Sequence, residues 1–599
     1  MDLPLVLDLA AVRLLYADGA TPQALLAALD ERIDAADPAV FISRAPAEML
    51  QGAVTALLAR APEPNSLPLW GVPFAVKDNI DVAGLPTTCA CPAFARVPMA
   101  DAGVVAKLVA AGGIVIGKTN LDQFATGLNG TRSPYGIPRS VFDPEHISGG
   151  SSSGSAVAVA AGLASFALGT DTAGSGRVPA AFNNLVGIKP TPGLLSTRGV
   201  VPACASLDCV SIFALSVADG SQVRRVAEGY DAADPWSRIA QPRPLPSQGL
   251  RIGVLPQAGR EFFGIAEHAD LYRQAIARTA GEPVEIDYAP FQDVASLLYE
   301  GPWVAERQAA FAGFGIDDSA LDPAVAAILA GSARFSAVDA FGGFHRLAEL
   351  KRRCEVELDR VDVLLLPTAP RSYTVAEMAA EPIAANARLG IYTNFCNLLG
   401  LAAIAVPAGF TSAGLPFGVT LLARPFADDA LALLADRLHR ESGCGAGIDR
   451  SATPATLSEP APSPDRIELA VVGAHLSGMP LNHELVALGA TLAARTRTTA
   501  EYRLFVLPGT QPAKPGLVRS PGAAGPGIEL EIWSLPPAGF ARFVAAIPSP
   551  LGIGRLQLAG GGEVSGFLCE PWAVQEAREI TAVGGWRAFC ESRSVSDSG

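Results

Sequence analysis

Over residues 1–445, segments whose apolar residues have the spacing of a helix alternate with segments whose apolar residues have the pattern of a strand. Residues 104–111 have the spacing of a helix, Gly112 and Gly113 end it, and residues 114–116 form the short apolar run of a buried strand. Further apolar runs at 361–367 and 402–407 predict buried strands, each ended by a proline. Strands alternating with helices in this way predict an α/β fold.

The alternation stops in a segment that has little to bury. Residues 446–465 contain Pro454, Pro460, Pro462 and Pro464 among alanines and serines, and proline propagates neither helix nor sheet. We expect this segment to be a linker between a first domain (1–445) and a second domain (466–599). Short apolar runs at 467–473, 529–533 and 566–569, separated by Gly/Pro turns, predict strands in the second domain.

Composition excludes several classes of function. A chain of 599 residues is too long for one hydrophobic core. The formal net charge is −14, and the sequence shows no basic stripe that would bind nucleic acid. The nine cysteines are scattered without CxxC pairs or nearby histidines, which predicts reduced thiols and no metal site. The start lacks a basic leader, and no apolar run reaches the length of a membrane span. We therefore expect a cytoplasmic protein.

Two serine-rich segments and one lysine indicate the chemistry. The first segment, 149–155, reads Gly-Gly-Ser-Ser-Ser-Gly-Ser and opens a predicted helix at 155–161; the second, 169–177, follows a predicted strand at 166–168. The Gly-bearing turn in the second segment is expected to expose Ser175 as a nucleophile. The backbone N–H groups of Thr172, Ala173, Gly174 and Ser175 would stabilise an oxyanion, where one donor contributes about 2.7–4 kcal/mol.

A serine hydroxyl needs a base to take its proton. His146 is one candidate, but the sequence places no obvious carboxylate to orient it. Lys77 is the other, with Ser151 as a proton relay. A neutral Lys77 requires burial to lower its pKa from about 10.4 to near 7, and the apolar run 72–76 before it predicts a buried strand end.

These three segments, in this order, resemble the amidase signature family. The resemblance implies a Ser-cisSer-Lys triad on a mixed sheet between helix layers, with Ser175 as nucleophile, Ser151 as the cis-peptide serine and Lys77 as base. It also implies that Ser152 hydrogen-bonds Lys77. Asp171 and Arg177 would brace the turn, and no metal or organic cofactor is required.

Residues 297–307 bear on the substrate. Tyr299 and Arg307 flank Pro302, and an arginine fork beside a phenol would hold a small carboxylate; a surface helix with solvated Glu306 and Arg307 is the alternative. Together with residues 122–128 and 130–136, this segment resembles the allophanate hydrolases. That resemblance implies that Tyr299 and Arg307 hold allophanate, a urea derivative with a carboxylate.

The second domain extends the resemblance. Residues 472–482 and 584–587 are similar to the C-terminal domain of the same enzymes, which implies an α+β fold like gamma-glutamylcyclotransferase and decarboxylation of N-carboxycarbamate. His475 is the candidate functional side chain there, although a histidine in such a turn also serves packing. The overall products would be ammonia and carbon dioxide.

The resemblance also implies partners. Because the chain has no Met-Lys-Met segment to carry biotin, a separate biotin-dependent urea carboxylase is the expected supplier of allophanate, and a homodimer through the first domain is expected. Two alternatives stay open: a general small-amide amidase or the glutaminase subunit of an amidotransferase, and, in another class, an inactive scaffold whose serine segments only turn the chain.

Overall fold

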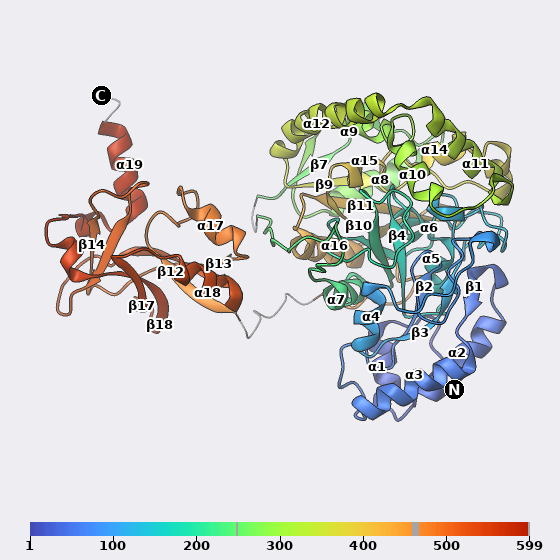
Figure 1. The fold of residues 1–599 in the computed structure, drawn as a ribbon, viewed down its shortest axis with the longest axis horizontal. Helices are drawn as coiled ribbons and strands as arrows, with labels where there is room; N and C mark the ends of the chain where they lie inside the picture. The colour runs from blue at the N-terminus through green and yellow to red at the C-terminus, as the bar shows by residue number, and fades with distance from the viewer. Residues whose placement is uncertain (247–248, 458–465, 597–599) are drawn as a thin grey trace. The chain divides into compact units, whose positions relative to one another are not determined.

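The computed structural model describes residues 1–246, 249–457 and 466–596. The chain divides into two compact units: Met1–Ile239 with Arg243–Ser458, and Ala240–Pro242 with Glu459–Gly599. Figure 1 shows both as ribbons.

The helices of the first unit are α1 (Leu9–Ala17), α2 (Pro22–Asp34), α3 (Ala47–Arg60), α4 (Gly103–Ala110), α5 (Ser153–Ala160), α6 (Val178–Phe182), α7 (Val217–Ala227), α8 (Ala266–Arg278), α9 (Ala289–Ser296), α10 (Trp303–Ala312), α11 (Pro323–Ala330), α12 (Ala337–Arg360), α13 (Val375–Ala380), α14 (Ala384–Leu389), α15 (Phe395–Leu398) and α16 (Asp428–Ser442). Its strands are β1 (Phe41–Arg44), β2 (Pro73–Lys77), β3 (Ile114–Thr119), β4 (Phe166–Asp171), β5 (Val186–Lys189), β6 (Cys209–Ala214), β7 (Arg251–Val254), β8 (Glu282–Glu285), β9 (Val363–Pro367), β10 (Ala402–Phe410) and β11 (Pro416–Ala423).

These strands form one mixed sheet between layers of helices (Figure 1). In the described residues it has 11 strands in the order β1-β3-β2-β4-β6-β5-β10-β11-β9-β7-β8. The central strands are buried on both faces, which explains the apolar runs at 73–76, 114–116, 166–168 and 363–367 in β2, β3, β4 and β9. The α/β architecture predicted from the sequence is confirmed.

The pairing of β2 with β4 positions the candidate site. The two strands are parallel neighbours, with Phe74 opposite Phe166 and Val76 opposite Leu168. Carboxyl ends of parallel neighbours lie at the same sheet edge. The end of β2 and the end of β4 therefore meet there, although 93 residues separate Lys77 from Thr170.

Two local expectations need correction. Pro407 does not end its strand, because β10 continues to Phe410 across a register shift between Pro407 and Gly409. Such irregularities let a strand accommodate proline. Of the expected linker, residues 446–457 belong to the first unit: Ala446 and Leu457 are buried in its core, and the Leu457 N–H donates to Asp436 Oδ1 at 3.1 Å. Residues 458–465 lie outside the described residues.

The second unit has an α+β architecture. Its strands are β12 (Ile467–Val471), β13 (Thr491–Arg497), β14 (Tyr502–Val506), β15 (Pro515–Arg519), β16 (Glu529–Leu535), β17 (Leu551–Gln557), β18 (Glu563–Cys569) and β19 (Arg578–Glu579), and its helices are α17 (Asn482–Ala487), α18 (Pro537–Ala545) and α19 (Trp586–Ser596). Within the described residues the sheets run β13-β16-β12-β18-β17 and β15-β14-β19 around a separate apolar core.

Candidate active site

Lys77 is the last residue of β2, and its side chain is fully buried. Its Nζ donates to Ser151 Oγ at 2.8 Å and to Thr170 Oγ1 at 2.7 Å. The Asn79 amide also donates to Thr170 Oγ1, at 3.2 Å. The structure thus brings the lysine and the first serine segment into direct contact, with Thr170 at the end of β4 holding the amine from the other side.

Burial sets the charge state of this amine. Removing the ammonium from water lowers the pKa of Lys77 to about 7, against the opposing effect of the carboxylates of Asp122, Asp171 and Asp208. Near pH 7 a large fraction of Lys77 is therefore neutral. A neutral amine can accept a proton, which is the property a base at this position needs.

Ser151 follows a cis peptide bond between Gly150 and Ser151. Its carbonyl oxygen accepts the Asp122 N–H at 3.0 Å, and helix α5 begins at Ser153. The expectation that Ser152 hydrogen-bonds Lys77 is wrong: Ser152 Oγ donates to the Thr170 carbonyl oxygen at 3.2 Å. Ser152 thus fastens α5 to β4, and the second partner of the lysine is the Thr170 hydroxyl.

Ser175 lies in the turn between β4 and α6, and the turn does not expose it: the residue is only 3% exposed. Asp171 accepts the N–H groups of Gly174 and Gly176 at 2.8 and 3.1 Å. Arg177 pairs with both oxygens of Asp171, at 2.9 and 3.0 Å. This buried ion pair sets the shape of the turn.

The Ser175 hydroxyl donates to the Gly127 carbonyl oxygen at 3.4 Å. Among the described residues no hydrogen bond joins it to Ser151. The relay is therefore complete from Lys77 to Ser151. Its last link, between Ser151 and Ser175, is not formed by a hydrogen bond in the described residues, where the Ser175 hydroxyl donates to Gly127.

The turn offers fewer oxyanion donors than expected. The Gly174 N–H is occupied by Asp171. The N–H groups of Thr172, Ala173 and Ser175 find no hydrogen-bond acceptor within the described chain. Buried backbone N–H groups are rarely left unpaired, so these three are the candidate donors to a ligand.

Gly174 has another role in the turn, where it adopts a φ of +137°. A Cβ there would clash with the Thr393 hydroxyl, a buried oxygen that lacks a hydrogen-bond partner in the described part of the chain. Glycine is required here by both backbone conformation and space.

Thr170, Asn79 and Asp208 were not singled out from the sequence. Asp208 Oδ1 accepts the Thr172 hydroxyl at 2.5 Å and thereby anchors the start of the turn. Thr170 was within reach of sequence reasoning, because it stands beside Asp171 in the second serine-rich segment. Asp208 had no such signal, since it lies outside the serine segments and the lysine segment.

Arg307 lies on α10, and its residue is 5% exposed. Its Nη1 donates to Thr126 Oγ1 at 2.7 Å, and Thr126 precedes Gly127, the partner of Ser175. Arg307 forms no ion pair with any described residue. Its charge does act on Asp208, where it opposes the rise in pKa that burial causes. A buried guanidinium in no direct contact with a carboxylate is a strong site for an anionic ligand.

Tyr299 lies in the turn before α10 and is half-buried against the core of the first unit. Its carbonyl oxygen accepts a hydrogen bond from Arg334 at 3.4 Å. Within the described residues its hydroxyl has no partner, and no hydrogen bond joins it to Arg307. The structure thus places Arg307 next to the segment that contacts Ser175. In the described residues it shows no contact between Tyr299 and Arg307, the two residues expected to hold a carboxylate together.

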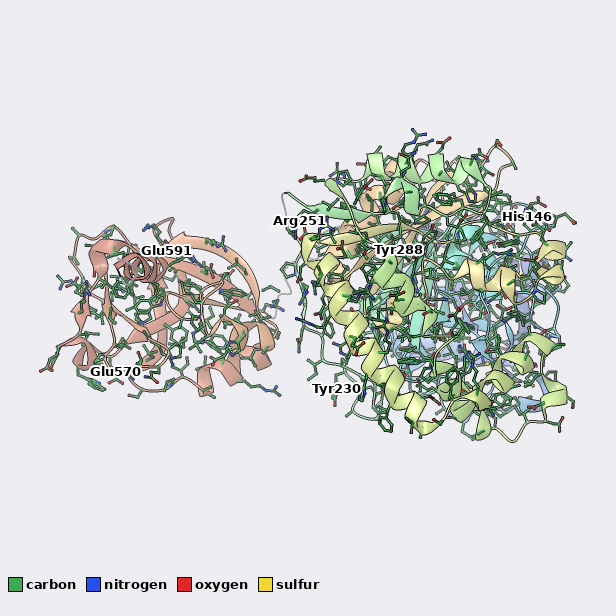
Figure 2. All side chains as sticks on the ribbon, turned by 90° about the horizontal axis from the view of Figure 1, so that it is seen from above. His146, Tyr230, Arg251, Tyr288, Glu570 and Glu591 are labelled. Carbon is green, nitrogen blue, oxygen red and sulfur yellow. The ribbon has the colours of Figure 1, made fainter. Side chains whose placement is uncertain are left out.

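His146 lies at the periphery of the first unit (Figure 2). The sequence showed no carboxylate partner for it, yet Asp143 Oδ2 lies 3.0 Å from its Nδ1. The pair sits in a surface turn, and the described residues show no contact between His146 and Ser175. His146 is therefore poorly placed to act as the base.

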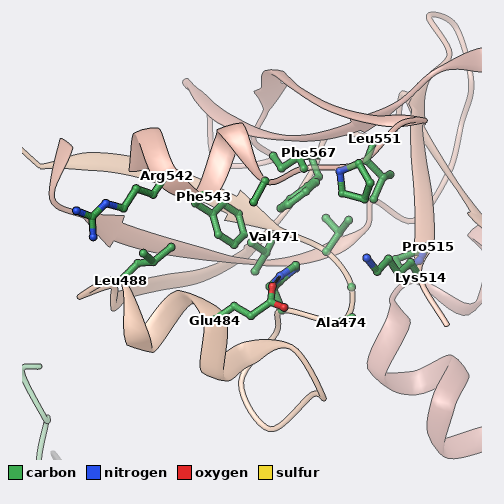
Figure 3. A pocket seen from close by; sticks show the side chains of 16 residues that line it. Val471, Ala474, Glu484, Leu488, Lys514, Pro515, Arg542, Phe543, Leu551 and Phe567 are labelled. Atoms are coloured by element: carbon green, nitrogen blue, oxygen red, sulfur yellow. Dashed lines mark hydrogen bonds and ion pairs between the residues drawn. The ribbon is translucent and has the colours of Figure 1, made fainter. Parts of the chain in front are cut away.

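The second unit contains a cavity of about 420 Å³ (Figure 3). Apolar walls include Val471, Leu551 and Phe567, and the polar lining residues are His475, Glu484, Lys514 and Arg542. Lys514 and Arg542 lie on opposite sides of it in Figure 3.

His475 is held firmly in this cavity. Its Nε2 lies 2.9 Å from Glu484 Oε2, and its ring stacks on Phe567 with centroids 5.6 Å apart. Burial lowers the pKa of His475 below its ordinary value, although Glu484 opposes the effect. The imidazole is therefore largely neutral at pH 7. His483, by contrast, contacts the Pro480 carbonyl oxygen in a more exposed position.

The described residues contain no group of three or more His, Cys, Asp or Glu side chains arranged to hold a metal ion. In the same part of the chain no single helix is both long and apolar enough to cross a membrane. One bent pair, residues 323–334 and 337–359, passes that length and composition test only when its members are taken together.

Comparisons with known proteins agree with this division of the chain. Residues 24–432 match the Amidase family, and residues 467–591 match the Allophanate hydrolase C-terminal domain. The urea amidolyase of Saccharomyces cerevisiae is 45% identical over 554 residues, which cover 89% of this chain and 30% of that protein. The chain thus spans less than a third of that relative.

Two solved structures are also similar. Allophanate hydrolase from Kluyveromyces lactis shares 41% identity and a TM-score of 0.74, covering 98% of this chain and all of that one. A glutamyl-tRNA(Gln) amidotransferase subunit from Thermotoga maritima shares 27% identity and a TM-score of 0.59 over 74% of this chain and 98% of its own. Only the first of these two matches extends over nearly the whole of this chain. The chain belongs to the amidase family and carries, after its amidase domain, the C-terminal domain of allophanate hydrolases.

Proposed function

We propose that this chain hydrolyses allophanate, releasing ammonia in its first unit and carbon dioxide with the help of its second. The observation that carries the choice of substrate is Arg307. It is a buried guanidinium without an ion-pair partner in the described residues, attached to the segment that contacts Ser175. A substrate that has an amide for Ser175 to attack and a carboxylate for Arg307 to bind suits both residues.

In the first step Ser175 Oγ attacks the terminal amide carbon of the substrate. Its proton passes to Ser151, whose own proton passes to neutral Lys77. The carbonyl oxygen takes the negative charge and is stabilised by the free N–H groups of Thr172, Ala173 and Ser175. Collapse of the tetrahedral intermediate breaks the C–N bond, and the proton held by Lys77 returns through Ser151 to the leaving ammonia.

Water then hydrolyses the acyl-enzyme by the same relay and frees N-carboxycarbamate. During both steps Arg307 holds the substrate carboxylate through the N–H groups that Thr126 does not use. A planar guanidinium fixes both the position and the orientation of a carboxylate. Tyr299 contributes its hydroxyl once the substrate is bound.

The cavity of the second unit suits the loss of carbon dioxide. In N-carboxycarbamate one C–N bond breaks, its electron pair stays on nitrogen together with a proton, and the carboxylate leaves as carbon dioxide. Apolar walls favour this step because they disfavour the charged reactant. His475, oriented by Glu484, is neutral: it takes the proton of the carboxyl group that leaves as carbon dioxide and returns that proton to the nitrogen. The resulting carbamate breaks down to a second ammonia and a second carbon dioxide.

Three further parts of the proposal come from family resemblance. They are a homodimer formed through the first unit, a cytoplasmic location, and supply of allophanate by a separate biotin-dependent urea carboxylase. They stay predictions. The molecular mass in solution tests the homodimer, the location of the protein in the cell tests the second prediction, and the dependence of allophanate breakdown on a urea carboxylase tests the third.

The test is ammonia release from allophanate by the purified full chain. Ser175→Ala should lower the rate by at least about a thousandfold, because the attacking atom is lost. Ser319→Ala, in an exposed position, is the matched control and should retain the parent rate. Ammonia release by Ser175→Ala at the parent rate would refute the nucleophile assignment.

A substrate panel separates the alternatives. A general amidase or a glutaminase subunit shares the serine and lysine arrangement but needs no carboxylate site, so faster turnover of acetamide or glutamine than of allophanate would favour it. An inactive scaffold would leave Ser175 unlabelled by a serine-directed phosphonofluoridate. We expect allophanate to be the best substrate and Ser175 to be labelled.

A further inference from the structure

Glu306, next to Arg307 on α10, is bound rather than solvated. Its Oε1 accepts the Ser206 N–H at 2.7 Å, and its Oε2 accepts the Ser206 hydroxyl at 2.7 Å and the Cys204 thiol at 3.3 Å. It has no ion-pair partner in the described residues. Three donors from one loop therefore hold this carboxylate, which fastens α10 to residues 203–208.

The same loop holds the serine turn. Asp208 accepts the N–H groups of Ala203 and Cys204, with distances of 2.8 to 3.2 Å, and the hydroxyl of Thr172 at 2.5 Å. Thr172 is the first of the candidate oxyanion donors. A continuous set of hydrogen bonds thus runs from α10 through the loop to the turn that would hold the substrate carbonyl.

The neighbouring residue reaches the other wall of the site. Arg307 donates to Thr126, and the next carbonyl oxygen along the chain, that of Gly127, accepts the Ser175 hydroxyl. Two consecutive residues of α10 therefore contact two segments: residues 126–127, which reach Ser175, and the 203–208 loop, which reaches Thr172 in the same turn. The attachment of Glu306 thus links the helix that carries the guanidinium to the loop that holds the first candidate oxyanion donor.

We propose that Glu306 is a positioning residue that determines the preference of the first unit for amides bearing a carboxylate. The inference rests on the proposed function, in which Arg307 binds that carboxylate. A substrate held at both ends reacts fast only when the two contacts have the right separation, since small displacements cost large factors in rate. A neutral amide does not use the guanidinium as a counter-ion and depends less on α10.

The experiment compares allophanate with biuret, in which a neutral amide replaces the carboxylate. Initial rates of ammonia release give kcat/KM for both substrates with the full chain and its variants. We expect Glu306→Ala to lower the ratio of allophanate to biuret by roughly tenfold to a hundredfold, with a higher KM for allophanate.

Matched variants separate positioning from folding. Glu306→Gln keeps an acceptor for the Ser206 N–H and should restore much of the ratio. Ser206→Ala removes one of the three donors and should lower the ratio severalfold. Glu349→Ala, an exposed residue of α12 paired with Arg346, should leave both rates unchanged.

The outcomes test the two hypotheses separately. A parent protein without preference for allophanate over biuret overturns the proposed function. A parent protein with that preference, together with a folded Glu306→Ala variant that retains it, overturns the role of Glu306. If Glu306→Ala does not fold, an unchanged ratio in Ser206→Ala overturns it instead, and a lowered ratio supports it.

Discussion

In the proposed hydrolysis, Lys77 as the base makes the rate depend on pH in a calculable way. Burial lowers its pKa to about 7, so the amine is charged below this pH and neutral above it. The base must be neutral to take a proton through Ser151. We therefore expect kcat/KM for ammonia release to rise with pH around a midpoint near 7.

The size of the effect follows from the neutral fraction. With a pKa near 7, about 9% of the lysine is neutral at pH 6 and about 91% at pH 8, so kcat/KM should increase about tenfold over this interval. A lysine with its ordinary pKa would give nearly a hundredfold over the same interval and would continue to rise beyond pH 9. The position of the plateau thus distinguishes a buried amine from a solvated one.

The assay measures initial ammonia release at low allophanate concentration between pH 6 and 9, at constant ionic strength, with the spontaneous breakdown of allophanate subtracted. Circular dichroism at each pH confirms that the chain stays folded. A flat profile, or a rate that falls as pH rises, would refute a titrating Lys77 as the base. A plateau reached only above pH 10 would refute the effect of burial.

Two further substitutions test neighbouring features. Thr170→Val removes one hydrogen-bond acceptor of the Lys77 ammonium, and kcat/KM should fall about tenfold. The midpoint of the pH profile should move to lower pH, because the Thr170 hydroxyl favours the charged form of Lys77. An unchanged rate and midpoint would show that Thr170 does not position the lysine. His475→Ala should leave the first ammonia per allophanate unchanged and delay the second, which a time course of ammonia release resolves. Equal loss of both ammonia molecules would contradict separate roles for the two units.

Much of the architecture was predictable because strands buried on both faces must be apolar throughout. The runs before Lys77 and at 361–367 show this, and they correspond to β2 and β9. Strand ends were less predictable. Pro407 looks like a terminator, yet β10 passes it because β11 continues the pairing on the far side of a register shift. Residues 446–457 look like a linker, yet the first unit supplies partners for them.

The sequence by itself determined which groups are candidates for the site, since a lysine after an apolar run and two serine segments in a set order predict a nucleophile, a relay and a base. Only the tertiary structure decided which atoms meet. The parallel pairing of β2 with β4 gave Lys77 the Thr170 hydroxyl instead of Ser152, and Asp171 removed the Gly174 N–H from the oxyanion donors. Hydrogen bonds from the 203–208 loop hold the Glu306 carboxylate, whereas the sequence also allowed this carboxylate to be solvated. The physical reason is that hydrogen bonds depend on the distance and direction between segments remote in sequence, which local patterns of polarity do not encode.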